Sequence, residues 1–320
     1  MDIFFYILKH NILPIYIVVI LGFILGKKFD LHVATLSKMN FFIFVPSFIF
    51  VNLYETKLGI DIVKITSFCT IYLLVNDVLA RLFSRMRNYD LGMSNAFKNS
   101  LLFHNVGNIG LSLVTLVYSS GPFLIDGHTP YLNDALATLI IILVFANISM
   151  NTLGFYNAGR SKMNVRHSLK QIFSMPSIYA IPLAFFLKSL DYDMHENAVW
   201  PALVYLKNGL IPIALLTLGV QLSKTRFGFT DTDVQFSVFT RLFVGPILAL
   251  GFVRMFGFTG VVAQTVFIAH SVPTAVNTAL IAIECNNHQE FATQAVVWST
   301  LLSAATLTLA VYVARVVFPV

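Results

Sequence analysis

Charged residues are scarce in this chain of 320 residues. Asp, Glu, Lys and Arg together make up 11% of it, while hydrophobic residues make up 57%. Soluble domains carry roughly 25% charged residues. A soluble chain with so few charges could not cover its surface, and the mean hydropathy of +0.77 points the same way. We therefore expect an integral membrane protein without a sizeable soluble domain.

Cysteine is equally rare, and this limits the chemistry that the chain can carry. The two cysteines, Cys69 and Cys285, fall in or beside apolar segments, so they suggest neither a disulfide framework nor a zinc site. We find no nucleophile–base set, metal-ligand spacing or phosphate-binding loop in the sequence. We therefore expect no enzymatic activity, no metal and no cofactor. The net charge of +6 is spread between apolar segments, which suits contact with anionic lipid rather than nucleic acid.

What the sequence has in abundance is apolar segments long enough to cross a membrane as helices. We count ten, and lipid offers their backbone no partner outside the helix itself. Their approximate limits are 11–27, 33–54, 62–84, 97–118, 131–156, 171–189, 198–221, 236–256, 260–284 and 293–317. A β-barrel would show shorter, alternating segments. The predicted class is therefore an all-α polytopic membrane protein with ten transmembrane helices.

Lys and Arg are distributed unevenly between the connections on the two sides of the membrane. One set of connections holds 13 of them and the opposite set holds 6. The positive-inside rule places the first set in the cytoplasm, and with ten spans both termini then lie outside. The basic connection 157–170 is the predicted joint between a first five-helix repeat, 1–156, and a second, 171–320. Because five is odd, the second repeat must be inverted relative to the first.

Two stretches place helix-breaking and polar residues in the middle of apolar segments: 104–110 (HNVGNIG) and 270–277 (HSVPTAVN). An offset of 166 residues relates them, and it also relates Pro46 to Pro212, which predict kinks in the second and seventh spans. Glycine weakens a helix, asparagine competes for backbone groups, and proline removes a backbone hydrogen bond. The pattern indicates an internal duplication with a broken helix in each half, which is typical of secondary transporters.

The two breaks predict a binding site. If both helices break, two half-helix N-termini point into the protein, each with roughly half a positive charge and free N–H donors. Such a site favours an anion, and a carboxylate suits it well. The alternative is a helix–helix contact through small and polar residues. The candidate substrate-binding residues are Asn105, Gly107, Asn108, Ser271, Pro273, Thr274 and Asn277.

Charged and titratable residues inside spans are functional candidates, because burying them in a membrane is costly. Asp77 in the third span could carry a coupling proton, and Arg241 in the eighth could hold Asp77 or neutralise substrate charge. The alternative is a fixed structural ion pair or a snorkelling arginine. His104 and His270 titrate near neutral pH and are candidates for proton handling. A lone histidine in a span is, however, more often a hydrogen-bonded spacer.

Five stretches, taken together and in order, resemble the auxin efflux carrier family, which is related to the bile-acid sodium symporters. Bacterial members of the family include proposed malate and malonate carriers. The resemblance covers nearly the whole chain, and the stretches that carry it are 104–111, 211–219, 240–246, 272–277 and 299–303. It implies ten helices in two inverted repeats, with helices 4 and 9 broken and crossing. It also implies a scaffold of spans 1, 2, 6 and 7, a transport domain that moves as an elevator, and a homodimer formed through the scaffold.

The resemblance further implies residue roles. Asparagines at the crossing would hold the substrate carboxylate, here Asn105 or Asn108 with Asn277 opposite, and the acidic residue of the third span would be Asp77. Two features depart from the family: Ser112 stands where members usually have proline, and the long cytoplasmic loop of the plant carriers is absent. These departures favour a short, prokaryotic-type member in the plasma membrane, which in bacteria is the inner membrane.

Three functions remain open at this point. The first is a carrier of small organic anions, driven by the membrane potential or a proton gradient. The second is a sodium-coupled organic anion symporter of the bile-acid type, which the scarcity of acidic residues near the breaks disfavours. The third is a membrane receptor that binds a ligand without moving it. In each case the expected partners are a small organic anion and the lipid bilayer, with no nucleic acid.

Overall fold

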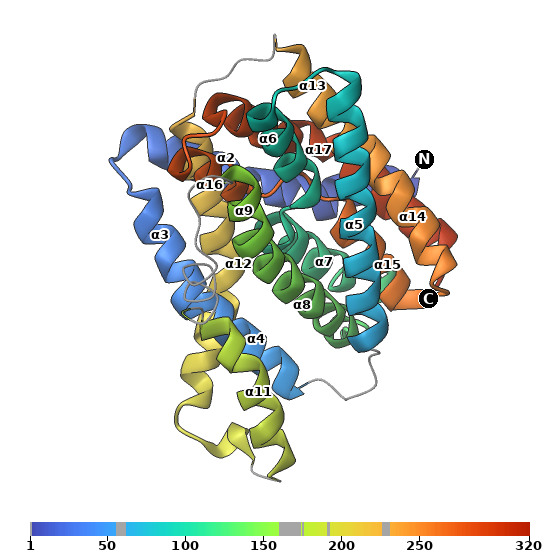
Figure 1. The fold of residues 1–320 in the computed structure, drawn as a ribbon. Coiled ribbons are helices and arrows are strands. Elements are labelled where there is room, and N and C mark those ends of the chain that lie inside the picture. The colour runs from blue at the N-terminus through green and yellow to red at the C-terminus, as the bar shows by residue number, and fades with distance from the viewer. Residues whose placement is uncertain (1, 56–61, 160–173, 175, 191–192, 226–230) are drawn as a thin grey trace.

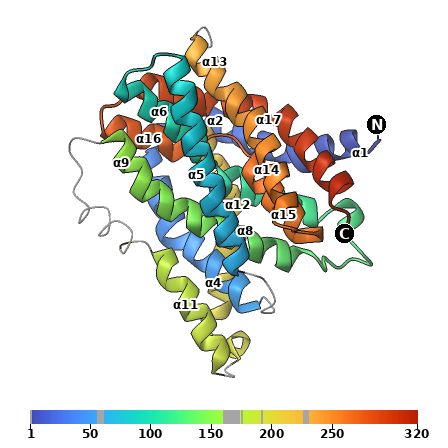
Figure 2. The same cartoon turned by 45° about the vertical axis from the view of Figure 1, so that its right-hand side comes forward.

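The chain is helical throughout the part that the structure describes. The computed structural model describes residues 2–55, 62–159, 174, 176–190, 193–225 and 231–320. In these ranges the regular elements are helices, and the only strand-like pairings are two isolated β-bridges. The bundle and its elements are shown from two sides in Figures 1 and 2. The prediction of an all-helical polytopic membrane protein is confirmed at this level.

The elements follow one another with short connections, and several spans contain a π-helical turn, labelled η. Those before residue 160 are α1 (Asp2–Ile7), η1 (Leu8–Ile12), α2 (Leu13–Lys28), α3 (Val33–Met39), η2 (Asn40–Phe44), α4 (Val45–Glu55), α5 (Ile62–Met86), α6 (Leu91–Leu102), η3 (Val106–Gly110), α7 (Leu111–Tyr118), the 3₁₀ turn η4 (Gly121–Phe123), α8 (Leu132–Ser149), η5 (Met150–Gly154) and α9 (Phe155–Ala158). Those after residue 175 are α11 (Pro176–Ser189), the 3₁₀ turn η6 (Met194–Glu196), α12 (Trp200–Ser223), α13 (Thr232–Phe239), η7 (Thr240–Val244), α14 (Gly245–Met255), α15 (Gly260–Ser271), α16 (Val276–Glu284) and α17 (Gln289–Val317).

Seven helical runs in the described ranges are long and apolar enough to cross a membrane. They correspond to the expected spans except the fourth, sixth and ninth. The fourth and ninth are each divided into two shorter helices, and the described part of the sixth, α11, has 14 residues. The number of ten spans therefore stays a prediction, as does the division into repeats 1–156 and 171–320. Most of the predicted joint, from residue 160 to 170, lies outside the described residues.

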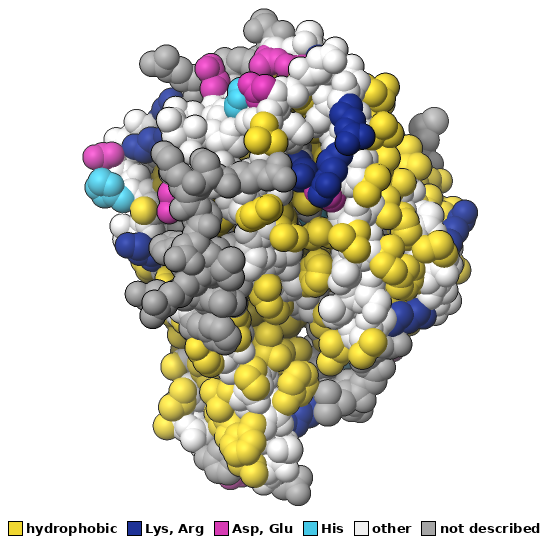
Figure 3. Space-filling model, viewed as in Figure 1, with side chains coloured by type: hydrophobic (Ala, Val, Ile, Leu, Met, Phe, Trp, Pro, Cys, Tyr) yellow, Lys and Arg dark blue, Asp and Glu magenta, His cyan; other side chains and the backbone are white. Residues whose placement is uncertain are grey.

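Apolar side chains cover much of the outer surface, as Figure 3 shows for one face. On α5, Leu74, Val78 and Leu82 are 56%, 64% and 50% exposed, while Phe68 and Tyr72 of the same helix are buried. The exposed and buried residues thus form two stripes of one helix, and the exposed stripe is as apolar as the buried one. Water would make such a surface costly, at about 25 cal/mol per Å² of apolar area. Lipid removes that cost, so this stripe suits a membrane.

One group of helices is built around the contact between α2 and α12. Gly22 of α2 and Gly219 of α12 face each other so closely that a Cβ on either one would overlap backbone atoms of the opposite helix. Close approach through small residues is how helices associate in lipid, where no hydrophobic force drives them together. α4 packs on α12 and on α11, and α4 and α11 extend together at the lower end of the view in Figure 1. We call α2, α4, α11 and α12 the α12 group.

The remaining helices form the larger part of the bundle. α15 lies between α8, α14 and α17, while α6 packs on α5. The two predicted kink residues lie in the α12 group. Pro46 is the second residue of α4, which follows the π-helix η2, and Pro212 lies inside α12. Proline has no backbone N–H, so the preceding turn lacks one α-helical hydrogen bond. This explains why the helix adopts a π-helical turn just before Pro46.

Candidate functional site

The two breaks meet each other inside the bundle. α6 ends at Leu102 and α15 ends at Ser271, and each is followed by a short extended stretch before the next helical turn. The stretches run antiparallel and form a β-bridge between His104 and Thr274. The Asn105 N–H donates to the carbonyl of Pro273 at 2.8 Å, and the Ala275 N–H donates to that of Phe103 at 2.9 Å. The backbone groups released by one break are thus partly satisfied by the other.

Arg241 joins the C-terminal ends of the two half-helices. It lies in η7 and is 1% exposed. Its Nε donates to the carbonyl of Val272 at 3.0 Å, its Nη1 to that of Leu101 at 3.0 Å, and its Nη2 to that of His270. These carbonyls lie at the ends of α15 and α6, where the helix dipole leaves partial negative charge. One buried cation therefore holds both breaks together, and we call this arrangement the Arg241 clamp.

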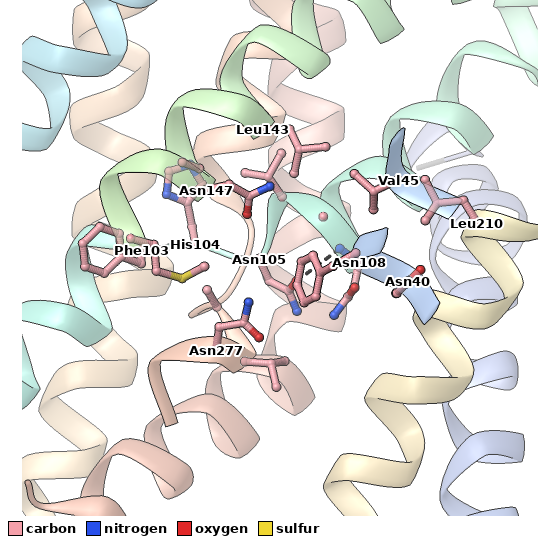
Figure 4. A pocket seen from close by; sticks show the side chains of 17 residues that line it. Asn40, Val45, Phe103, His104, Asn105, Asn108, Leu143, Asn147, Leu210 and Asn277 are labelled. Carbon is pink, nitrogen blue, oxygen red and sulfur yellow. Dashed lines mark hydrogen bonds between the residues drawn. The ribbon is translucent and has the colours of Figure 1, made fainter. Parts of the chain in front are cut away.

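The N-terminal ends of the following half-helices face a small cavity, which we call the asparagine pocket. It has a volume of about 50 Å³ and lies between the breaks, the π-helix η2, the middle of α12 and the end of α8 (Figure 4). Its lining residues are Asn40, Phe41, Val45, Phe103, His104, Asn105, Val106, Gly107, Asn108, Leu143, Ala146, Asn147, Met150, Leu210, Ala275, Val276 and Asn277. The first residues of η3 and of α16 are among them. The pocket therefore receives two positive helix ends, while the Arg241 clamp takes the negative ones.

Side-chain amides supply the polar part of the pocket. Asn105, Asn108 and Asn277 gather around the same space in Figure 4. The Oδ1 of Asn105 accepts a hydrogen bond from the backbone N–H of Asn108 at 3.2 Å, so this side chain caps the start of η3. Its Nδ2 is buried and has no hydrogen-bond partner among the described residues, and the same holds for the Oδ1 of Asn40. Buried polar atoms are nearly always hydrogen-bonded, so these two indicate that a ligand or water completes the pocket.

Four of the predicted substrate-binding residues line the pocket: Asn105, Gly107, Asn108 and Asn277. The other three, Ser271, Pro273 and Thr274, do not, because their polar groups are used inside the crossing. The Ser271 hydroxyl donates to the carbonyl of Phe267 at 2.8 Å, and the Thr274 hydroxyl donates to that of Ser100 at 2.9 Å. Pro273 accepts the hydrogen bond from Asn105 described above. The structure therefore divides the predicted set into residues that face the pocket and residues that shape the crossing.

The two predicted histidines lie side by side, with ring centres 4.8 Å apart. His104 lines the pocket, and by geometry neither of its buried ring nitrogens has a hydrogen-bond partner in the part of the chain that the structure describes. His270 lies behind it, away from the pocket, where its Nδ1 bonds the carbonyl of Val266 at 2.8 Å and its ring meets Phe68 and Tyr72. Of the pair, only His104 can meet a ligand in this arrangement.

Asp77 lies apart from both the pocket and Arg241. Its carboxylate pairs with Arg81 one turn along α5, at 2.6 Å, and with Lys98 of α6, at 3.1 Å. The expectation that Arg241 could hold Asp77 is therefore wrong, because Arg241 donates its three bonds to backbone carbonyls. Ser112, which replaces the expected proline, donates its hydroxyl to the carbonyl of Asn108 at 2.7 Å. The half-helix therefore continues through this position without a break.

Sequence reasoning missed two asparagines of the pocket, Asn40 and Asn147. Asn40 opens η2, and Asn147 lies one turn before η5. Among the described residues, three π-helices, η2, η3 and η5, contribute to the lining, in keeping with the frequent presence of such turns at functional sites. An isolated asparagine inside an apolar segment was a usable signal for both residues, since polar groups in a span usually face the protein interior.

Comparison with known proteins identifies the family of this chain. Residues 7–312 match the model of a family described as membrane transport protein. The chain belongs to this family. The resemblance to the auxin efflux carriers is thereby confirmed, and the molecule is an integral membrane transporter rather than an enzyme. The transporter is also similar to an uncharacterized transporter of the archaeon Methanothermobacter thermautotrophicus, with 23% identity over 305 residues, which covers 94% of this chain and 96% of the relative.

Proposed function

We propose that this transporter moves a small organic anion, a carboxylate, through the asparagine pocket. The observation that carries the proposal is the meeting of two helix N-termini and the asparagine side chains of Asn105, Asn108 and Asn277 in one cavity. A carboxylate accepts hydrogen bonds from both kinds of donor, and the helix ends supply favourable partial charge. Asn108 and Asn277 are placed to donate to such a ligand. Asn105 contributes its free Nδ2 while its oxygen caps η3.

The charge of the bound anion has no formal counter-charge in the pocket. Among the described residues that line it, none is Asp, Glu, Lys or Arg. Transport of a carboxylate would therefore carry net charge across the membrane, which makes the membrane potential the favoured driving force. The lack of a carboxylate in the same lining also weighs against a bile-acid-type sodium site, since hard cations take oxygen ligands that include acidic side chains.

The position of the pocket supports an elevator mechanism. Its wall is shared between the broken helices and the α12 group, because Val45 of α4 and Leu210 of α12 line it, and Asn40 comes from η2, which leads into α4. A cavity of about 50 Å³ holds only one or two waters, each of which occupies about 30 Å³ in the liquid. Small-molecule sites typically occupy roughly 300–1,000 Å³. We call the helices α5–α9 and α13–α17 the broken-helix body. Sliding of this body against the α12 group would widen the pocket and expose it alternately on the two sides.

Charge movement in proteoliposomes tests the proposal. Malate, malonate, indole-3-acetate and a bile acid would be offered on a solid-supported membrane, each with and without sodium and at two pH values. We expect a sodium-independent current with at least one carboxylate. A current that requires sodium would indicate a sodium-coupled symporter instead. A current that follows the pH difference would assign the coupling to protons. Binding without any current would contradict transport of these anions.

Asn277→Ala tests the site itself. The substitution removes one amide donor to a charged acceptor, which is worth about 1.5–3 kcal/mol and weakens binding roughly 10- to 100-fold. Asn277 is preferred over Asn105, because loss of the Asn105 cap would disturb η3 as well. Asn133→Ala, at an exposed position near the start of α8, is the matched control. Equal substrate affinity in both variants would contradict the assignment of the pocket.

A further inference from the structure

A second cavity lies at the end of the bundle where α1, η4, α15 and α17 come together. Its volume is about 580 Å³, and we call it the Arg315 pocket. Its lining residues are Ile3, Tyr6, Gly121, Pro122, Phe123, Tyr131, Gln264, Arg315, Val316, Pro319 and Val320. It shares no residue with the asparagine pocket. Figure 2 shows α1 and the end of α17 on one side of the molecule.

Arg315 is the only ionisable Lys, Arg, Asp or Glu side chain among the described residues of this lining, and its charge is incompletely satisfied. Its Nε and Nη2 atoms are buried and have no hydrogen-bond partner in the described part of the chain. The guanidinium lies over the ring of Phe123, 5.1 Å from the ring centre. That contact covers one face of the group, and Arg315 itself lines the cavity. Arg315 is half-buried, and N–H groups removed from water without an acceptor are costly, so the geometry favours an anion beside this guanidinium.

The rest of the pocket is suited to an apolar chain. Tyr6, Phe123 and Tyr131 offer aromatic surface, and Ile3 and Val316 are 53% and 59% exposed. The buried amide of Gln264 does not compete for the anion. Its Nε2 donates to the carbonyl of Phe318 at 2.7 Å, and its Oε1 accepts from Tyr118 at 3.2 Å. The pocket thus joins one cationic edge to an extended apolar wall.

The depth of Arg315 agrees with an amphiphilic ligand. α17 has 29 residues, so at 1.5 Å per residue it is about 43 Å long, against a hydrocarbon core of about 30 Å. Arg315 lies in the last turn of this helix. A helix that exceeds the core by about 13 Å brings its last turn to the depth of the lipid headgroups.

We propose that the Arg315 pocket binds an amphiphilic anion, with its phosphate or carboxylate on the guanidinium of Arg315 and its acyl chain along the apolar wall. The ligand could come from two sources, an anionic phospholipid of the bilayer or a free fatty acid, and the head-group chemistry is the same for both. An occupant would contact α1 together with α15 and α17, and would therefore link the first span to the broken-helix body.

Native mass spectrometry of the full chain, released from a non-ionic detergent, tests this site. The probes are dioleoylphosphatidylglycerol, dodecanoate, dioleoylphosphatidylcholine and inorganic phosphate. We expect one tightly bound molecule of phosphatidylglycerol or of dodecanoate, and whichever binds tighter identifies the source. Inorganic phosphate should bind at least tenfold more weakly, because it lacks the acyl chain. Equal binding of phosphatidylcholine and the anionic probes would overturn the role of the anion, and equal binding of inorganic phosphate would overturn that of the chain.

Two variants locate the site. Arg315→Gln should weaken binding of the anionic probe about tenfold or more, as expected for loss of a charge-assisted hydrogen bond. Arg254→Gln removes the same charge from an exposed position at the end of α14 and should leave binding unchanged. Val316→Trp fills the pocket without changing its charge and should also weaken binding. The proposal is overturned if Arg315→Gln and Arg254→Gln bind the probe equally, or if Val316→Trp retains full affinity.

Discussion

Replacement of Arg241 by methionine should loosen the crossing of the broken helices. The side chain donates hydrogen bonds to the carbonyls of Leu101, His270 and Val272. Each buried carbonyl left unsatisfied costs about 1–3 kcal/mol. Relief of the desolvation of the cation offsets part of this, so we expect a net loss of about 3–5 kcal/mol, as for other broken buried charge contacts. At about 2.1 cal/mol/K per residue over 320 residues, that loss corresponds to a fall of roughly 5–7 °C in the unfolding midpoint.

A thiol-reactive fluorescent dye gives a direct readout of this region. Cys69 is 2% exposed and its Sγ lies 3.9 Å from Nε2 of His270, so it becomes reactive when the crossing opens. In a Cys285→Ala background, dye labelling would therefore report on Cys69 alone. Arg241→Lys keeps the charge but cannot reach all three carbonyls, and it should fall between the parent and Arg241→Met. Arg254→Met, at an exposed position, is the control.

Two results would refute the clamp. In the first, Arg241→Met unfolds within about 2 °C of the control, which corresponds to less than about 1 kcal/mol. In the second, the variant keeps its stability and loses only the binding of the anion. Arg241 would then act on the charge of the substrate, as the sequence had suggested, and not on the ends of α6 and α15.

Two further predictions concern packing and the buried ion pair. Gly219→Ala should destabilise the contact between α2 and α12 by about 1–3 kcal/mol, because the added Cβ overlaps backbone atoms of α2. Gly251→Ala is the control for thermal unfolding. Its added Cβ meets nothing within 4 Å, so it should be neutral. Asp77→Asn should cost about 1–3 kcal/mol, because it leaves Lys98 without its acidic partner, and adding Lys98→Met should restore that stability. If Asp77 also couples transport to protons, the transport current of the Asp77→Asn, Lys98→Met double variant should not depend on pH. A pH dependence equal to that of the parent protein would contradict the coupling role.

Much of the fold could be predicted from the sequence, because the bilayer leaves few solutions. Long apolar segments without charges must become helices, and glycine, asparagine and proline inside them mark where a helix fails. The breaks after Leu102 and Ser271 fall at the predicted stretches for this reason. The family could also be recognised, since two of the five stretches that resemble it, 104–111 and 272–277, contain the breaks. The number of spans, the repeats and the orientation of the termini stay predictions.

Only the tertiary structure decided which polar residues face the pocket. Asn277 and Thr274 stand three residues apart. Asn277 lines the cavity, whereas the Thr274 hydroxyl donates a hydrogen bond to the carbonyl of Ser100. The hydrogen-bond partners of Arg241 could not be read from the sequence either. Sequence reasoning looked for a carboxylate, whereas three helix-end carbonyls converge on the guanidinium because two breaks far apart in the chain meet. Sequence by itself determined where the helices break. Which groups each break leaves free depended on what folds against it, since a hydrogen bond needs both partners in place.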